Sequence, residues 1–334
     1  MALAAVLFSL AIVIPTARAI EPVQDKQLID LGHEKYRLLF TELIEEHNFH
    51  QEELDKLFSG VRIKRNVLKL MDKQWEAKPY YLYRPLFVTR SVIYEGKKQG
   101  NKYRKVLDRI EQELGVDREV ILAIWGIESR FGRHKGHHKV FQSLNTLFDA
   151  YPRRSDFFRE QLIHFLLLCR ENRYDPLAIT GSYAGAFGQT QFIPSSFREY
   201  SVSFDGDKRR DVFNSVPDIL ASIANYLRSF HYRLDTPLYL DIGTRLTDQQ
   251  LLSAHSSGRK GRIDYRTVSK AQNVALPPPP DNRELSIVGL EIDPEMGGGF
   301  RYVAGYPNFH AITEWNHSNR YAMAVSELAE AIKD

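Results

Sequence analysis

The sequence of 334 residues has a single cysteine, Cys169, so no internal disulfide can form and stability must come from a packed core. Cys169 ends the apolar run HFLLLC, which favours a buried thiol over a catalytic one. Basic side chains barely exceed acidic ones (45 against 42), and no long basic run occurs, so we expect no nucleic-acid partner. A phosphate-binding loop, an HExxH pair and a CxxC pair are also missing, which leaves nucleotide, zinc-peptidase and thiol-redox chemistry without a motif.

Long apolar runs are rare as well, and the clearest one is at the start, in MALAAVLFSLAIVIPTARA. It ends in a small-x-small cleavage pattern, which predicts a secretory signal peptide over residues 1–19. Its apolar part is too short to span a bilayer comfortably. No cysteine follows for lipid attachment, so we expect a periplasmic protein without a stable membrane anchor.

The hydrophobic pattern that follows predicts a mainly α (α+β) fold. Helical spacing indicates an N-terminal helical region over 20–90 and a more apolar helical core over 91–233. The hydrophobic pattern changes over 234–300, where PLYLDIG, RIDYRTV and ELSIVGLEI are typical of strands and LTDQQLLSA of a short helix. We interpret this stretch as a small α/β insertion, and we expect residues 301–334 to return to helix and complete the core.

One carboxylate, Glu128, interrupts an otherwise apolar helix, AIWGIESRFG. Asp117 is a suitable N-cap for this helix and Gly132 a suitable stop. Glu128 then shares a face with Ile124 and Trp125, where desolvation would raise the pKa of its carboxyl and keep it protonated as a general acid. The helix alone leaves open a simpler role, in which Glu128 pairs with a nearby arginine (Arg130 or Arg133).

Four stretches bear on that choice. They are GIESRFG (126–132), YPRRSDFF (151–158), GSYAGAFGQTQFIPSSF (181–197) and WNHSNRYAMAV (315–325). In this order they resemble the B-type lytic murein transglycosylases, which cleave peptidoglycan glycan strands, and the resemblance runs from about residue 30 to the C-terminus. It implies a lysozyme-like helical catalytic core, peptidoglycan as the substrate and no required cofactor.

The resemblance implies that Glu128 is the single catalytic acid and base. Glu128 would protonate the β-1,4 oxygen between N-acetylmuramic acid and N-acetylglucosamine, then take the proton of the C6 hydroxyl as a 1,6-anhydro ring closes. The other matched positions are expected to bind substrate, and they are Ser182, Gln191, Arg153, Arg154, Tyr226, Trp315, Asn316 and Tyr321. Each has a structural alternative: a turn, an internally satisfied amide, a solvated arginine pair or a core ring. Trp315 stands where the family would have a tyrosine.

The segment SFDGDKRRDVFN (203–214) resembles a metal loop that some relatives carry. Asp205, Asp207 and Asp211 are its candidate calcium ligands. The loop has Lys208 where a glycine is wanted and no closing carboxylate, so we favour a turn held by its own side chains over tight calcium binding.

Two other functions stay open at this stage. A hydrolytic muramidase would need a second carboxylate to activate water, and the nearest acids in the sequence, Asp149, Asp156 and Asp175, share no evident face with Glu128. A non-catalytic peptidoglycan-binding protein is the other alternative. We expect a monomer whose partners are glycan strands and other cell-wall enzymes.

Overall fold

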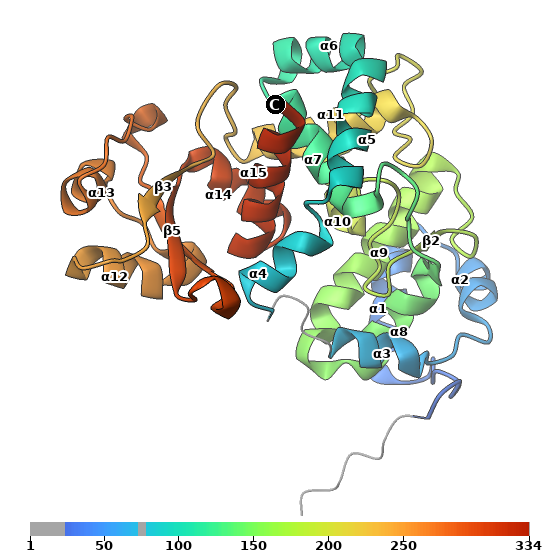
Figure 1. The fold of residues 1–334 in the computed structure, drawn as a ribbon. Helices are drawn as coiled ribbons and strands as arrows, with labels where there is room; N and C mark the ends of the chain where they lie inside the picture. Colours follow the sequence, from blue (N-terminus) through green and yellow to red (C-terminus); the bar gives the residue numbers. More distant parts are fainter. Residues whose placement is uncertain (1–23, 73–77, 334) are drawn as a thin grey trace, which may run out of the picture.

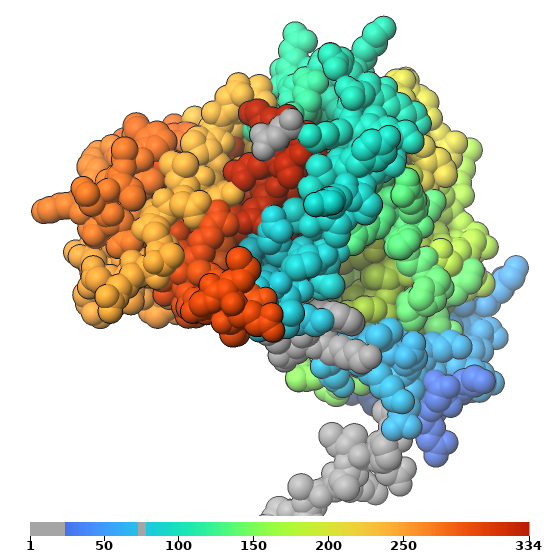
Figure 2. Space-filling model, viewed as in Figure 1, coloured from blue at the N-terminus to red at the C-terminus, as the bar shows by residue number. Residues whose placement is uncertain are grey.

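The computed structural model describes residues 24–72 and 78–333, so the predicted signal peptide lies outside the described residues. Figure 1 shows a helical body with a smaller sheet-bearing lobe at one side, and Figure 2 shows that lobe in gold and orange beside the helices. The mainly α (α+β) class expected from the sequence is confirmed. Within the described residues, none of the helices combines the length and the apolar character that a bilayer crossing requires.

The first three helices pack at one end of the body. They are α1 (Glu34–Glu45), α2 (Gln51–Phe58) and α3 (Arg65–Met71), whereas the short helix α4 (Tyr80–Tyr83) contacts β4 (Ser286–Glu291). The buried ring of Tyr36 on α1 lies edge-on to Phe58 of α2 (6.3 Å between centroids) and to Phe148 of α8 (Val140–Ala150; 4.9 Å). This aromatic cluster fixes α1 and α2 to α8, because ring pairs at these distances add to the burial of apolar area.

The remaining helices complete the body. They are α5 (Arg90–Lys102), α6 (Arg104–Leu114), α7 (Arg118–Ser129), α8 (Val140–Ala150), α9 (Ser155–Asn172), α10 (Pro194–Tyr200), α11 (Val216–Ser229), α14 (Pro307–Trp315) and α15 (Asn319–Lys333). A short antiparallel pair, β1 (His138–Lys139) and β2 (Thr180–Gly181), joins two loops. Helix α7 contacts α5, α6, α11 and α15 and is buried on nearly every side, as its apolar sequence requires.

The side lobe contains an antiparallel sheet with its own small core. Its strand order is β3–β5–β4, with β3 at Tyr239–Gly243, β4 at Ser286–Glu291 and β5 at Phe300–Gly305. In the central strand, Val303 pairs with Asp241 of β3 and Val288 of β4. Helices α12 (Gln249–Ser256) and α13 (Tyr265–Gln272) complete the lobe. Short 3₁₀ turns lie at Arg84–Leu86, Pro152–Arg154, Gly258–Lys260, Pro280–Asn282 and Pro294–Met296.

Two local expectations were wrong in this lobe. RIDYRTV is not a strand, because Asp264 accepts the backbone N–H of Arg266 (2.8 Å) and starts helix α13. The segment after 300 begins with β5 rather than a helix, since two flanking strands pair with it. The division at residues 90, 233 and 300 stays a prediction.

A charged network ties the lobe to the body. Glu327 of α15, only 9% exposed, accepts hydrogen bonds from Arg301 of β5 (2.6 Å) and from Tyr80 of α4 (3.1 Å), and also binds Arg84. Arg301 in turn binds Asp241 of β3 (2.6 Å). A buried carboxylate with this many donors is satisfied, so the network fixes the sheet against α15.

Candidate active site

The end of α7 sets the position of Glu128. The helix stops at Ser129, because Arg130 and Phe131 are both left-handed (φ 51° and 57°) and precede Gly132. Gly132, the glycine expected to stop the helix, lies two residues beyond the C-cap Arg130, and the ring of Phe131 between them packs on Trp125 (5.3 Å between centroids). The chain reverses directly after Glu128, which brings that side chain to the edge of the core.

The other end of α7 also differs from expectation. Asp117 occupies the N-cap position, but its carboxylate accepts a hydrogen bond from the hydroxyl of Tyr232 (2.7 Å) instead of a helix amide. Burial is the main cause that raises the pKa of the Asp117 carboxyl. Asp117 therefore anchors the segment after α11 to the start of α7.

Two donors from the C-terminal helices converge on Glu128. Its Oε1 accepts hydrogen bonds from the indole Nε1 of Trp315 (3.0 Å) and the hydroxyl of Tyr321 (2.5 Å). Burial, followed by the charge of the nearby Glu128, raises the pKa of Tyr321 well above its ordinary value. This hydroxyl therefore stays protonated and donates a hydrogen bond to Glu128. The two arginines considered as partners are engaged elsewhere, Arg133 with Glu95 (2.9 Å) and Arg130 with the carbonyl of Leu86.

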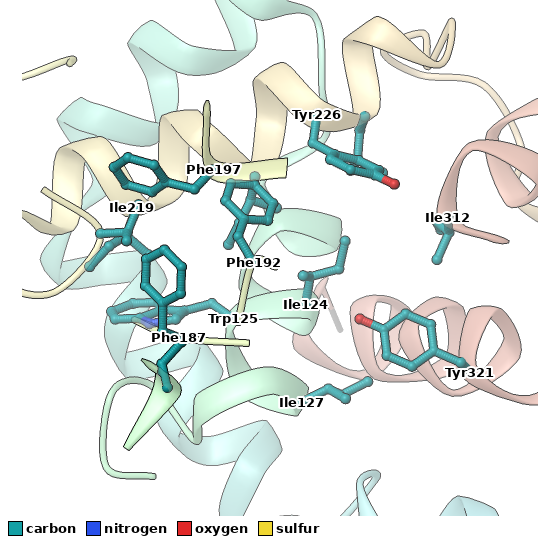
Figure 3. Close-up of a cluster of buried hydrophobic side chains, with 14 of the residues drawn as sticks. Ile124, Trp125, Ile127, Phe187, Phe192, Phe197, Ile219, Tyr226, Ile312 and Tyr321 are labelled. Carbon is teal, nitrogen blue, oxygen red and sulfur yellow. The ribbon is translucent and has the colours of Figure 1, made fainter. Parts of the chain in front are cut away.

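Aromatic rings form a wall beside Glu128. The ring of Trp315 lies 4.7 Å from that of Tyr226 and 5.0 Å from that of Phe192, and Tyr200 lies 4.6 Å from Tyr226. Figure 3 shows Phe192 and Tyr226 on one side of Ile124 of α7 and Tyr321 on another. The Tyr226 hydroxyl donates to the backbone carbonyl of Glu314 (2.6 Å), which fixes this ring. Rings of this kind offer flat faces to a sugar.

Glu128 and this wall line one cleft of about 670 Å³. Six of the residues predicted from the sequence line it, namely Glu128, Arg154, Gln191, Tyr226, Trp315 and Asn316. Asn316 follows the last residue of α14 and lies in the turn before α15, as the NHSNRY segment predicted. Tyr321 lies beneath the cleft and reaches it only through Glu128. The cleft therefore combines an acid, polar groups and stacking faces.

The glycine-rich loop brings Gln191 to the cleft but uses Ser182 differently. Gln191, at a left-handed φ of 50°, donates to the carbonyls of Gly188 (2.8 Å) and Lys135 (3.3 Å). The hydroxyl of Ser182 accepts the amide of Ala186 (3.0 Å) within the loop, and Ser182 does not line the cleft. These bonds hold the loop in shape, and sugar binding by Ser182 stays a prediction.

The two arginines of YPRRSDFF lie in different environments. Arg154 lines the cleft with its guanidinium over the ring of Phe157 (4.1 Å). Arg153 is 74% exposed and pairs with Asp72 (2.8 Å). Only Arg154 is placed to meet a ligand in this cleft.

Sequence reasoning missed two acids that line the cleft, Glu199 of α10 and Glu314 of α14. The Glu314 carboxylate pairs with Arg259, while Glu199 is exposed. Of the acids weighed from the sequence, Asp149 pairs with Lys35 (2.9 Å) and does not line the cleft. The sequence signal for the two missed acids was the position of Glu199 between Arg198 and Tyr200 and of Glu314 next to Trp315.

The segment 203–218, called the aspartate loop below, contains a carboxylate that the sequence pattern did not include. Asp205 and Asp207 lie within 4.8 Å of the buried Asp218, and this trio replaces the expected set with Asp211. The Asp211 carboxylate instead accepts the amides of Phe213 (2.8 Å) and Asn214 (3.0 Å). Asp218 accepts three backbone amides, which hold the loop in shape. Weak or absent calcium binding at this loop stays a prediction.

Comparisons with known proteins show the family and the fold. The transglycosylase SLT domain family matches residues 33–330. Membrane-bound lytic murein transglycosylase B of Escherichia coli (strain K12) is 33% identical over 306 residues, which cover 87% of this chain and 80% of that protein. The crystal structure of soluble lytic transglycosylase SltB1 from Pseudomonas aeruginosa has a TM-score of 0.79 at 36% identity and covers 88% of this chain and 97% of its own. SltB3 from the same organism, in complex with NAG-NAM-pentapeptide, has a TM-score of 0.74 at 28% identity, covering 90% and 79%.

Proposed function

The chain belongs to the transglycosylase SLT domain family and is a lytic murein transglycosylase, and we propose that Glu128 is the single acid and base of its reaction. The observation that carries this proposal is the position of Glu128 in the cleft, with two donors on one of its carboxylate oxygens. The substrate bond is the β-1,4 link between N-acetylmuramic acid and N-acetylglucosamine.

The donors determine which oxygen can carry the catalytic proton. An indole N–H can only donate, so Oε1 must remain an acceptor and the acidic proton belongs on Oε2. That proton passes to the glycosidic oxygen as the bond to C1 breaks and positive charge develops on the muramic ring. Glu128, now ionised, takes the C6 hydroxyl proton while O6 bonds to C1. The nucleophile is part of the substrate, so proximity supplies much of the rate.

The other cleft residues would bind the glycan. The aromatic wall of Tyr226 and Trp315 supports stacking on a sugar face. Asn316 supplies an amide for the acetamido or hydroxyl groups of the sugar, and Gln191, whose amide N–H groups are bound to carbonyls, supplies its amide oxygen as an acceptor. Arg154 supplies a positive charge at the cleft edge. We also propose a periplasmic site of action, which the leader-like first residues and the murein-directed relatives support.

A hydrolytic muramidase remains the second candidate because two acids line the cleft. Glu314 is paired with Arg259, so Glu199 is the one to test as a base for water. A non-catalytic binding role is the third candidate.

Mass spectrometry of murein digests separates the three. The wild type should release 1,6-anhydro products, Glu128→Gln should lower the rate by about 10³-fold or more, and Glu199→Gln should retain the anhydro products. Reducing ends in place of anhydro ends would indicate hydrolysis. Equal release by wild type and Glu128→Gln would show that Glu128 is not the catalytic acid, and no release by the wild type would leave only a binding role.

A further inference from the structure

A second hollow opens directly beside the cleft. This groove, of about 790 Å³, lies where the sheet lobe meets α11 and α14. Phe230 and Glu314 line both hollows, so a polymer that occupies the cleft can send a branch into the groove.

Two arginines in this groove are not paired with an acid. Arg262 donates to the carbonyls of Arg259 (2.7 Å) and Gly261 (2.8 Å), and Arg283 donates to that of His231 (3.3 Å). Neither forms an ion pair with any residue in the described part of the chain. A guanidinium bound only to carbonyls keeps its full charge for a ligand, and its planar fork suits a carboxylate.

The acids of the groove do not cancel this charge. Asp281 pairs with Arg233, and Glu314 pairs with Arg259, which leaves the exposed Glu284 as the remaining carboxylate of the lining. Partial burial, followed by the neighbouring Arg259, lowers the pKa of Arg262, while Glu284 and Glu314 oppose that shift. An incoming anion would stabilise the charged form of the guanidinium.

His310 adds a polar group to the same groove. Its side chain is 7% exposed, and its Nε2 has no hydrogen-bond partner within the described residues. Burial, followed by the charges of Arg262 and Arg283, lowers the pKa of His310 to about 3. His310 is therefore neutral at physiological pH, and the cationic character of the groove comes from the arginines.

We propose that Arg262 and Arg283 bind a carboxylate of the murein peptide stem while its glycan strand lies in the cleft. This inference rests on the proposed function, since it places the stem from the position of the reacting sugar. Stems are the anionic branches of murein, and the shared wall at Phe230 and Glu314 gives such a branch a path. The groove would thus favour stem-bearing strands over stripped ones.

The test compares wild type, the double variant Arg262→Gln/Arg283→Gln and the control Arg266→Gln, an exposed arginine on α13 outside both hollows. Three substrates are used: strands with stems, strands whose stem carboxylates are amidated, and strands stripped at the lactyl amide. The double variant should raise KM on stem-bearing strands by about tenfold and change KM less than twofold on the other two. Arg266→Gln should match wild type throughout.

The proposal would be overturned if the double variant changed KM equally on all three substrates, or if it changed KM on stripped strands, which carry only the lactyl carboxylate. An unchanged KM on stem-bearing strands would also overturn it. Co-sedimentation with insoluble murein is repeated in the Glu128→Gln background. Loss of binding on removing the arginines there supports the groove even if the chemistry assigned to Glu128 fails. A thermal melt of each variant checks that it is folded.

Discussion

Glu128 is half-buried at the cleft and Asp218 is fully buried, and the two carboxylates are held in opposite ways. Glu128 accepts side-chain donors, Trp315 and Tyr321, that lie nearly two hundred residues later in the chain. Asp218 accepts backbone amides from its own neighbourhood, those of Phe204 (2.7 Å), Asp205 (3.3 Å) and Asp211 (3.0 Å).

The difference supports the proposal that Glu128 is the reactive carboxylate and that Asp218 is a structural one. Backbone amides cannot move without unfolding the loop, so Asp218 works as a fixed acceptor that closes the turn before α11. Donor side chains at a cleft wall can lengthen or tighten their bonds as charge appears and disappears on Glu128. We therefore expect changes at Glu128 to affect the reaction rate and changes at Asp218 to affect the free energy of unfolding.

Removing each carboxylate should affect a different property. Glu128→Gln should cost about 10³-fold in rate and change the free energy of unfolding by less than about 1 kcal/mol, because an amide can still accept at Oε1. Asp218→Ala should lower the free energy of unfolding by about 3–4 kcal/mol, because it leaves up to three amides without an acceptor. Urea unfolding and murein digestion of both variants check this.

Asp218→Asn is the matched control for that pair. It keeps one amide oxygen as an acceptor but turns an N–H toward one backbone amide, so the loss should be about 1–2 kcal/mol. The rate per folded molecule should stay near that of wild type for both Asp218 variants. A rate loss that exceeds the loss of folded protein would contradict the structural assignment of Asp218.

The sequence predicted these two sites unequally. Glu128 was found because its signal is local: a carboxylate on an apolar helical face, followed by a family motif. Asp218 was missed because it lies outside the loop pattern, in the first turn of α11. The acid Glu314 and its pairing with Arg259 depend on contacts between distant segments, which periodicity cannot reveal.

The sheet lobe shows the same limit. Strands β3 and β4 were predicted from their β-branched, alternating residues, whereas β5 was not. Its place depends on partners at both edges, Asp241 on β3 and Val288 on β4. Helix α13 was predicted as a strand because the capping role of Asp264 competes with a short alternating pattern.

Trp315 offers a smaller effect that sharpens the role of the side-chain donors. Trp315→Phe keeps a ring but removes the donor to Glu128, so kcat should fall about tenfold. A donated hydrogen bond favours the ionised carboxylate, so its loss should move the alkaline limb of the kcat profile to higher pH. Tyr321→Phe removes the other donor to the same oxygen and should shift the limb in the same direction.

Trp315→Tyr is the conservative control, because it carries a hydroxyl donor and matches the tyrosine expected at this position. Part of the lost rate should return, together with part of the pH shift. A purely structural role for the indole predicts the reverse pattern, with lower stability and an unmoved alkaline limb. That pattern in the pH profiles would refute the donor role of Trp315.

The smallest effect concerns calcium at the aspartate loop. Its carboxylates are already satisfied by amides and by the hydroxyl of Ser215, which donates to Asp205 (2.7 Å) and is the main cause that lowers the pKa of that carboxyl. Adding calcium or a chelator should therefore shift the melting temperature by less than about 2 °C, because ligands that bind weakly stabilise little. Millimolar calcium could instead raise the melting temperature by 5 °C or more, and Asp218→Asn could abolish that rise. Asp218 would then be a metal ligand, and its assignment as a purely structural carboxylate, unlike Glu128, would be wrong.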